Sequence, residues 1–270
     1  MTNIENIRPI IFVLVLASCL LLQWKFPSRQ SDLDRWKFMG SNIGIVLFNN
    51  LIILLLPIIP YQTSSFGVTN NYGLFNLLLT NVNLNNSIIT TLIVITGIII
   101  LDIVIYFQHR LFHKVNFLWK LHSMHHIDPM LDVTSGLRFH PIEIILSNFL
   151  KVLTVIVFGI QPLSVIIFEV ALNSLAMFNH SNIKINSKIE NILNKILITP
   201  AIHTIHHSKI LKETNSNYGF SVPWWDMLFK TYTPVGKYDQ EHINIGTVPM
   251  PEKKYQLFPG MLVQPFIKNK

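Results

Sequence analysis

Histidine is concentrated in one part of this chain, at spacings that suit metal binding. The sequence has 270 residues and 11 histidines, and all but His242 fall between positions 109 and 207. Eight of them form three groups: His109 and His113, then His122, His125 and His126, then His203, His206 and His207. Residues three and four apart share one face of an α-helix, so each group is predicted to direct its imidazoles toward a common point.

These groups predict a site for two adjacent metal ions. Imidazole is a strong ligand for iron, zinc and copper. Eight convergent imidazoles exceed what one ion needs, whereas two neighbouring ions would use them all. Alone, His140 or His180 would be interpreted as a hydrogen-bonded histidine at the membrane interface. Both flank a predicted hairpin that returns them to the membrane face of the groups, so we expect them to be further ligands.

The elements that must position these histidines are membrane-spanning helices. Half of the residues are hydrophobic and 13% are charged, and the mean hydropathy is +0.42, which is typical of a membrane protein. Five segments are predicted to cross a bilayer: Ile10–Trp24, Ile43–Ile59, Ile88–Phe107, Ile142–Ile160 and Leu163–Phe178. Only Gln161 and Pro162 separate the last two. The predicted fold is an all-α integral membrane protein with about three transmembrane helices, a helical hairpin and a cytoplasmic histidine-rich cap.

The distribution of Lys and Arg orients these spans. Four basic residues lie between the first two spans, none in residues 61–87, four in residues 108–141, none in the hairpin turn and eleven after residue 178. The positive-inside rule then places the histidine groups on the cytoplasmic side, with Arg8 as the single exception. The net charge of +7 indicates contact with anionic lipid headgroups rather than with nucleic acid.

Ionisable residues inside the predicted spans have two interpretations each. Asp102 and Tyr106 share a helix face with the first histidine pair, and Asp102 would lie about 10 Å deeper than His109. We expect Asp102 to accept a hydrogen bond from a ligating imidazole, the alternative being a neutral acid bonded to a neighbouring helix. Lys151 and Glu169 would face each other in the hairpin. A structural ion pair is the favoured interpretation, and substrate binding is the alternative.

The residues around the histidines favour iron and oxygen chemistry. The metalloprotease motif H-E-x-x-H is absent, because Arg110 rather than Glu follows His109. Carboxylates are scarce near the groups, unlike in ferritin-type di-iron sites. A histidine-rich pair of ions that opens toward lipid suits di-iron activation of O₂ for attack on an unactivated C–H bond. Zinc binds more tightly than ferrous iron, so we expect it as a substitute in some preparations.

Residues 88–232 contain an ordered set of motifs: Asp102-x₃-Tyr106-x₂-His109-Arg110-x₂-His113, Leu118-Trp119-x₂-His122-x₂-His125-His126, Leu137-Arg138-Phe139-His140-Pro141-Ile142-Glu143, Asn179-His180-Ser181-Asn182, Thr199-Pro200-x₂-His203-x₂-His206-His207-Ser208, Asn217-Tyr218-Gly219 and Trp225-Asp226-x-Leu228-Phe229. This set resembles the sterol desaturase / fatty acid hydroxylase superfamily of integral-membrane, non-haem di-iron enzymes. The resemblance implies two iron ions held by the eight grouped histidines, joined by His140 and His180. It also implies that Asp102, Tyr106 and Asn217 surround the ligands, that O₂ is the co-substrate and that a separate donor or reductase supplies electrons.

The resemblance also divides the chain. Residues 1–86 are expected to form N-terminal transmembrane helices and an external loop, which starts near Tyr61. Residues 87–232 are expected to form a fatty acid hydroxylase-type catalytic domain, and residues 233–270 a polar cytoplasmic tail that includes His242. Within the catalytic part, the segment Ser187–Ile198 has the apolar spacing of an amphipathic helix on the cytoplasmic leaflet.

Two functions are compatible with these features. We expect a membrane-bound, O₂-dependent di-iron oxidoreductase that hydroxylates, or desaturates, a C–H bond of a lipid in lipid biosynthesis or modification. The alternative is a membrane metal-binding protein or zinc transporter without oxidative chemistry. Both the bacterial inner membrane and the endoplasmic reticulum remain open as locations.

Overall fold

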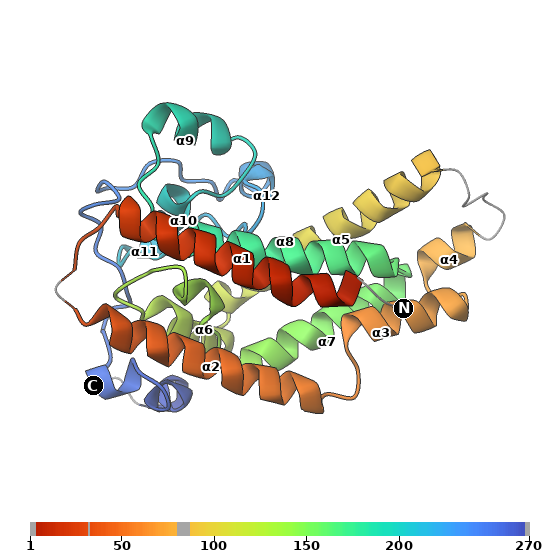
Figure 1. Cartoon of the computed structure of the whole chain (residues 1–270), viewed down its shortest axis with the longest axis horizontal. Coiled ribbons are helices and arrows are strands. Elements are labelled where there is room, and N and C mark those ends of the chain that lie inside the picture. The colour runs from red at the N-terminus through yellow and green to blue at the C-terminus, as the bar shows by residue number, and fades with distance from the viewer. Residues whose placement is uncertain (1–3, 32, 80–86, 268–270) are drawn as a thin grey trace.

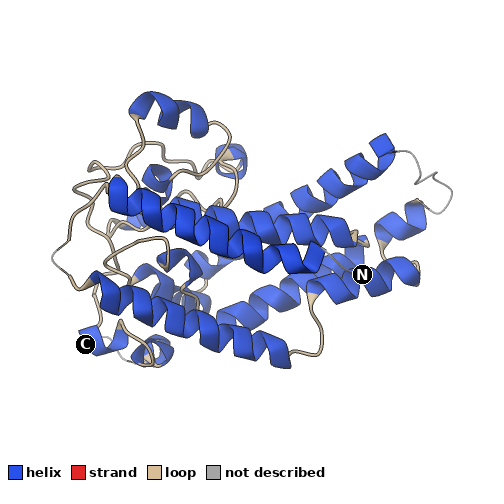
Figure 2. Ribbon diagram, in the orientation of Figure 1, coloured by secondary structure: helices blue, strands red, loops and turns tan. Residues whose placement is uncertain are grey.

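Helices make up all the regular structure of the part of the chain that the structure describes. The computed structural model describes residues 4–31, 33–79 and 87–267 (Figure 2). The long helices are α1 (Ile4–Lys25), α2 (Arg35–Leu55), α5 (Ser87–Lys114), α7 (Pro141–Phe158) and α8 (Pro162–His180). In the described ranges, five segments built on these helices are long and apolar enough to cross a membrane. The prediction of an all-α membrane protein is confirmed, and the five candidate spans agree with the expected helices and hairpin.

The hairpin of α7 and α8 has a turn whose residues explain its tightness. Gly159 ends α7 with a φ of +67°, a left-handed conformation that glycine adopts without steric cost. Pro162 begins α8, where the missing N–H of proline leaves no helical hydrogen bond unmade. Leu101 and Ile105 of α5 pack with Val155 and Phe168 of the two hairpin helices. The hairpin and α5 therefore share one buried core.

An ion pair crosses the hairpin as predicted, and a third charged residue joins it. Lys151 Nζ lies 3.0 Å from Glu169 Oε1. Arg8 of α1 donates a hydrogen bond to the other carboxylate oxygen of Glu169. This ion triad, defined as Arg8, Lys151 and Glu169, connects α1 to both helices of the hairpin.

The segment after α2 differs from the irregular external loop that the sequence led us to expect. It contains α3 (Pro60–Thr69) and α4 (Leu74–Leu78), and the remaining loop residues 80–86 lie outside the described ranges. Helix α3 packs against α7 and α8, and Ser64 donates a hydrogen bond to the carbonyl of Ile160 in the hairpin turn. Helical structure forms within the expected loop because tertiary packing buries one face of α3, and the external position of this segment stays a prediction.

The remaining elements gather at one end of the long helices and form the cap (Figure 1). They are α6 (Asn116–His126), η1 (Ser135–Leu137), α9 (Ser187–Leu193), α10 (Pro200–His206), α11 (Leu211–Thr214), α12 (Trp224–Leu228), η2 (Lys253–Tyr255), η3 (Gly260–Leu262) and η4 (Gln264–Phe266). The tail is less polar in its packing than predicted, because Met261 is buried with Ile45 of α2 and Met124 of α6. The expected amphipathic helix is shorter, and Ile189 and Ile192 of α9 are exposed.

Candidate metal centre

Nine histidines from four helices form two clusters. The first cluster contains His109 and His113 of α5, His122 and His126 of α6, and His206 of α10. The second cluster contains His125 of α6, His180 of α8, His203 of α10 and His207, which caps α10. Within each cluster, one ring nitrogen from every histidine lies within 4.8 Å of those of the others. Each cluster is therefore small enough for its histidines to share one ion.

Each histidine triplet divides between the clusters instead of pointing to one place. In α6, His122 and His126 join the first cluster while His125 joins the second. In α10 the assignment is reversed, because His203 and His207 join the second cluster and His206 the first. Residues i and i+4 lie on the same face of a helix and share a cluster. The i+3 residue of each triplet is rotated around the helix axis and joins the other cluster. Both triplets thus connect the two clusters.

The two clusters are in direct contact. The rings of His126 and His207, one from each cluster, are stacked with their centroids 4.3 Å apart. The rings of His122 and His125 lie 5.2 Å apart. Two ions bound in the clusters would therefore be neighbours, as the number of histidines led us to predict.

Distances between ring nitrogens fit metal coordination. The Nε2 atoms of His125 and His180 are 2.9 Å apart, as are those of His180 and His203, and those of His203 and His207 are 3.2 Å apart. In the first cluster, the Nε2 atoms of His109 and His122 are 3.1 Å apart. Two nitrogens bound to one ion at about 2.1 Å, with a right angle between the bonds, would lie about 3.0 Å apart.

Hydrogen bonds behind the rings direct Nε2 of five histidines toward the clusters. The Nδ1 atom of His122 lies 2.7 Å from Glu143 Oε1, and a backbone carbonyl holds Nδ1 of the other four. These carbonyls belong to Tyr218 for His109, Arg138 for His125, Ala176 for His180 and Ser216 for His206. When Nδ1–H donates to such an oxygen, Nε2 keeps the lone pair that a metal requires.

Several buried ring nitrogens lack a hydrogen-bond partner among the described residues. They are both nitrogens of His113 and His126, Nδ1 of His203 and His207, and Nε2 of His206. Leaving a buried polar atom unpaired costs about 1–3 kcal/mol, so seven such atoms in one place require an explanation. Bound metal ions would explain one nitrogen in each of His113, His126 and His206, because each residue offers one ligand atom, and the nine residues fit such ions by type and distance.

Burial keeps the cap histidines neutral. It lowers the pKa of His122 to about 3. Burial, with the added repulsion of neighbouring histidines, lowers the pKa of the other cap histidines well below the usual 6.5, namely those of His125, His126, His203, His206 and His207. Neutral imidazole is the form that binds metal.

We predict that the metal-free protein loses stability as the pH falls below about 6.5. The unfolded chain binds protons there while the folded clusters do not, so the stabilisation is complete above pH 6.5 and declines toward the low folded-state pKa values. Thermal unfolding in detergent at about pH 7.5, 6.0 and 5.0, values on both sides of the ordinary pKa of histidine, measures the effect. Replacing the exposed His242 by Ala should leave the profile unchanged. A midpoint that stays constant over this range would contradict the prediction.

The three residues expected around the ligands lie behind the clusters. Tyr106 shares a hydrogen bond of 2.7 Å with Thr231. Asn217, with a φ of +53°, bonds the backbone of Ile202 in α10 and of Thr233. Asp102 accepts a 2.6 Å hydrogen bond from the indole nitrogen of Trp225, not from a histidine as we expected. These residues therefore connect α5 and α10 to the segment that follows α10.

Replacing Asp102 by Asn is predicted to change stability by no more than about 1 kcal/mol, because Asn keeps an acceptor for the Trp225 indole. Trp225→Phe is predicted to cost about 1–3 kcal/mol, because the half-buried carboxyl then loses this donor. Thermal unfolding of both variants in detergent measures the difference. Equal losses would contradict the assigned hydrogen bond.

His140 is not brought into either cluster. Its Nδ1 accepts a hydrogen bond from the backbone N–H of Ile142 and caps α7, and its Nε2 lies 3.2 Å from the carbonyl oxygen of Leu262. His180, in contrast, lies within the second cluster. The two histidines looked alike in sequence because both flank the hairpin, but only one of them points inward.

Two acidic residues near the clusters were not assigned a role from the sequence. Glu143 contacts His122, and its position in an apolar helix directly after the His140-Pro141 motif was the available signal. Asp226 accepts hydrogen bonds from the N–H groups of Tyr218 and Gly219. It thereby fixes the segment whose carbonyls hold His109 and His206.

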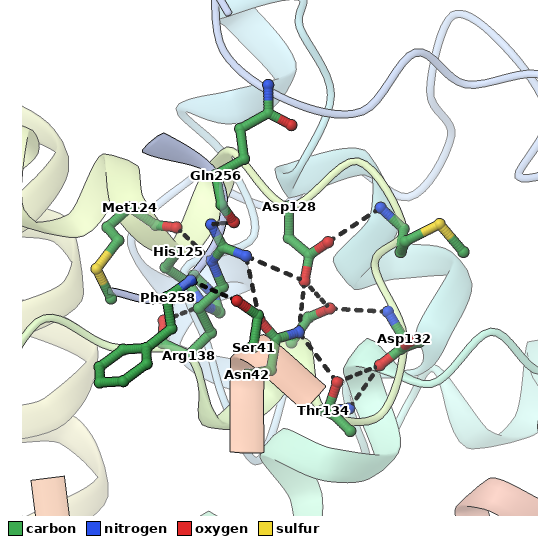
Figure 3. A network of polar contacts seen from close by, with 12 residues as sticks. Ser41, Asn42, Met124, His125, Asp128, Asp132, Thr134, Arg138, Gln256 and Phe258 are labelled. Atoms are coloured by element: carbon green, nitrogen blue, oxygen red, sulfur yellow. Dashed lines mark hydrogen bonds and ion pairs between the residues drawn. The ribbon is translucent and has the colours of Figure 1, made fainter. Parts of the chain in front are cut away.

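A buried polar network fixes the backbone behind His125 (Figure 3). Arg138 is fully buried and donates to the carbonyls of Met124 and Gln256 and to Asn42 Oδ1, at 2.8, 2.9 and 3.1 Å. Asp128 lies 3.8 Å from the same guanidinium group and accepts hydrogen bonds from Asn42 and Ser135. The network joins α2, the loop after α6 and the C-terminal segment around the backbone that positions His125.

Comparisons with known proteins agree with this site. Residues 94–231 match the fatty acid hydroxylase family. The chain is 33% identical over 129 residues to an ornithine lipid hydroxylase from Rhizobium tropici, covering 47% of this chain and 38% of that protein. It is 32% identical over 135 residues to an alkylglycerol monooxygenase from Xenopus tropicalis, covering 49% of this chain and 29% of that protein. It is 30% identical over 139 residues to sphinganine C4-monooxygenase 1 from Arabidopsis thaliana, covering 50% and 51%.

The matches are confined to part of each relative. The chain spans between 29% and 51% of the length of these three proteins. No solved protein structure matches the chain.

Proposed function

Because the chain belongs to the fatty acid hydroxylase family, we propose that it is a membrane-bound, O₂-dependent di-iron oxidoreductase that hydroxylates, or desaturates, a C–H bond of a lipid. The observation that carries this proposal is the pair of touching clusters with nine imidazoles. The names of the three relatives describe hydroxylases and monooxygenases of lipids, which supports the choice of reaction.

The proposed ligands are the nine clustered histidines: His109, His113, His122, His126 and His206 for one ion, and His125, His180, His203 and His207 for the other. His140 is left out, because both of its ring nitrogens contact the backbone. Two bound irons, with O₂ and electrons from a separate donor, would supply the oxidising power for breaking a C–H bond. Zinc would occupy the same nitrogens without this redox chemistry.

The residues of the chain hold and shield this centre. Glu143 and the backbone carbonyls orient the imidazoles, which fixes the positions of the ligand atoms before metal binds. The ring of Phe139 lies parallel to that of His125 with centroids 4.6 Å apart, and Phe220 lies 4.6 Å from His109. These aromatic rings limit the access of water to the centre.

We place the cap on the cytoplasmic side, where a soluble electron donor can reach it. The support is the positive-inside rule, since the cap and the segment between α1 and α2 contain most of the 21 basic residues. The lipid substrate would approach from the membrane, and its polar reaction partners from the cytosol.

The test is iron-dependent oxidation by the purified full chain in lipid nanodiscs with a chemical or enzymatic reductant. We expect O₂ consumption that requires iron, and a lipid product heavier by one oxygen atom or lighter by two hydrogens. Zinc-loaded protein should consume no O₂. Absence of both consumption and product with a total lipid extract, together with zinc movement across proteoliposomes, would instead support a transporter.

A further inference from the structure

A cavity of about 530 Å³ lies within the membrane-spanning part of the protein. Its walls come from α1, α2, α3, α7, α8 and the segment before α7. Phe12, Val46, Ile53 and Leu172 contribute apolar wall. The volume is in the range of about 300–1,000 Å³ that is typical of small-molecule sites.

One end of the cavity lies close to the metal-site histidines without being lined by them. Phe139 lines this end, and its ring covers the ring of His125 at a centroid distance of 4.6 Å. Gly136 also lines it, and a Cβ atom at this position would lie 3.1 Å from Nδ1 of His180. A single layer of side chain thus separates the cavity from the second cluster.

The ion triad lines the other end. Lys151 lies ten residues beyond the start of α7, and Glu169 lies eleven residues before His180 at the end of α8. At 1.5 Å per residue, both helices place the triad roughly 15–17 Å from the level of the metal-site histidines. The lining of the cavity therefore extends from the ion triad to Gly136 and Phe139, which lie beside the second cluster.

The triad carries an excess of positive charge. Arg8 and Lys151 share the single carboxylate of Glu169, and no other charged side chain lines the cavity among the described residues. A pair would be neutral, but a second cation leaves a net charge of +1 on helices that are long and apolar enough to span the membrane, where an uncompensated charge is costly. An anion from outside the chain would balance it.

An unpaired acceptor lies along the same cavity. Asn49 of α2 is 6% exposed, and its Nδ2 donates a 2.9 Å hydrogen bond to the carbonyl of Phe139, which fixes the orientation of the amide. Its Oδ1 atom is buried and has no hydrogen-bond partner among the described residues. Such an acceptor is satisfied by a donor such as water, so it makes this part of the cavity wall polar and does not itself identify the occupant.

We propose that this cavity binds a single-chain lipid with one anionic headgroup, held by Lys151 and Arg8, with its chain directed past Asn49 toward Phe139 and the metal-site histidines. This inference rests on the proposed function, because it takes the bound lipid to be the substrate. It adds that the substrate is an acidic lipid and that its reacting carbon is distant from the headgroup.

The experiment measures lipid binding to the metal-free full chain in nanodiscs of phosphatidylcholine. Three labelled probes with the same chain are compared: a fatty acid, its methyl ester and the corresponding monoacyl phosphate. We expect the wild-type protein to bind one of the two acids about tenfold or more tightly than the ester, since a charge-assisted hydrogen bond contributes about 1.5–3 kcal/mol. The acid that binds more tightly identifies the headgroup as carboxylate or phosphate.

Two variants connect this selectivity to the triad. Lys151→Met should reduce the ratio of acid affinity to ester affinity to near one, whereas Lys151→Arg should preserve this ratio. The control Lys188→Met changes an exposed residue of α9 and should leave the ratio unchanged. Equal binding of all three probes by the wild-type protein would overturn the proposal, as would full selectivity in Lys151→Met. If Lys151→Met does not fold, the ratio of acid to ester affinity in the wild-type protein and in Lys151→Arg still tests the proposal.

This measurement needs no iron and no turnover, so it separates the two proposals. Acid-selective binding without any oxidised product would contradict the proposed function alone. Oxidation of lipids without acid selectivity would contradict only the assignment of the cavity.

Discussion

Replacing His206 or His125 by Ala is expected to abolish lipid oxidation and to lower metal affinity by more than about 100-fold. Changes to the groups behind a ligand already cost about 10–100-fold, and each of these variants removes a ligand atom itself. His206 belongs to the first cluster and His125 to the second, so the two variants test both positions. Iron content after gel filtration and product formation are the measurements.

His140→Ala provides the matched control for these variants. It removes a histidine from the same part of the chain, but one whose two ring nitrogens contact only backbone groups. Its iron content should equal that of the wild-type protein. Loss of one iron in His140→Ala, or normal turnover in either ligand variant, would contradict the assignment of nine ligands.

The second large effect is expected for Arg138→Met, which should lower the free energy of unfolding by about 3–5 kcal/mol. The guanidinium group is fully buried, and its removal takes a hydrogen-bond donor from two carbonyls and from Asn42 Oδ1, and the positive partner from the buried Asp128. Because the carbonyl of Arg138 also holds His125, metal binding should weaken as well. Thermal unfolding in detergent measures the loss.

Lys188→Met is the control for Arg138→Met, because it removes an exposed positive charge and should change the free energy of unfolding by less than about 0.5 kcal/mol. A loss of similar size in both variants would indicate that charge, not the buried network, determines stability. An unfolding midpoint of Arg138→Met equal to that of the wild-type protein would contradict the role of the network.

The long helices and the histidine spacing could be predicted from sequence because both depend on local periodicity. Apolar segments of sufficient length produced α1, α2, α5 and the hairpin, and the i, i+4 pairs do share a cluster. The Lys151–Glu169 pair could also be predicted, because a tight turn fixes which residues of α7 and α8 face each other.

Features that depend on packing between distant segments could not be predicted. Arg8 was only an exception to the charge rule until the packing of α1 on α8 placed it beside Glu169. The division of each triplet follows from how α6 and α10 are rotated toward each other, which no spacing reports. His140 and His180 could not be distinguished, since the C-terminal segment that contacts His140 lies more than 100 residues away.

The central claim is that nine histidines hold two neighbouring metal ions, and the number of irons bound per chain tests it most directly. Full-length protein is saturated with ferrous iron without oxygen, freed of excess metal and analysed for iron and protein. We predict two irons per chain in the wild-type protein. One iron or none at saturation would contradict the account.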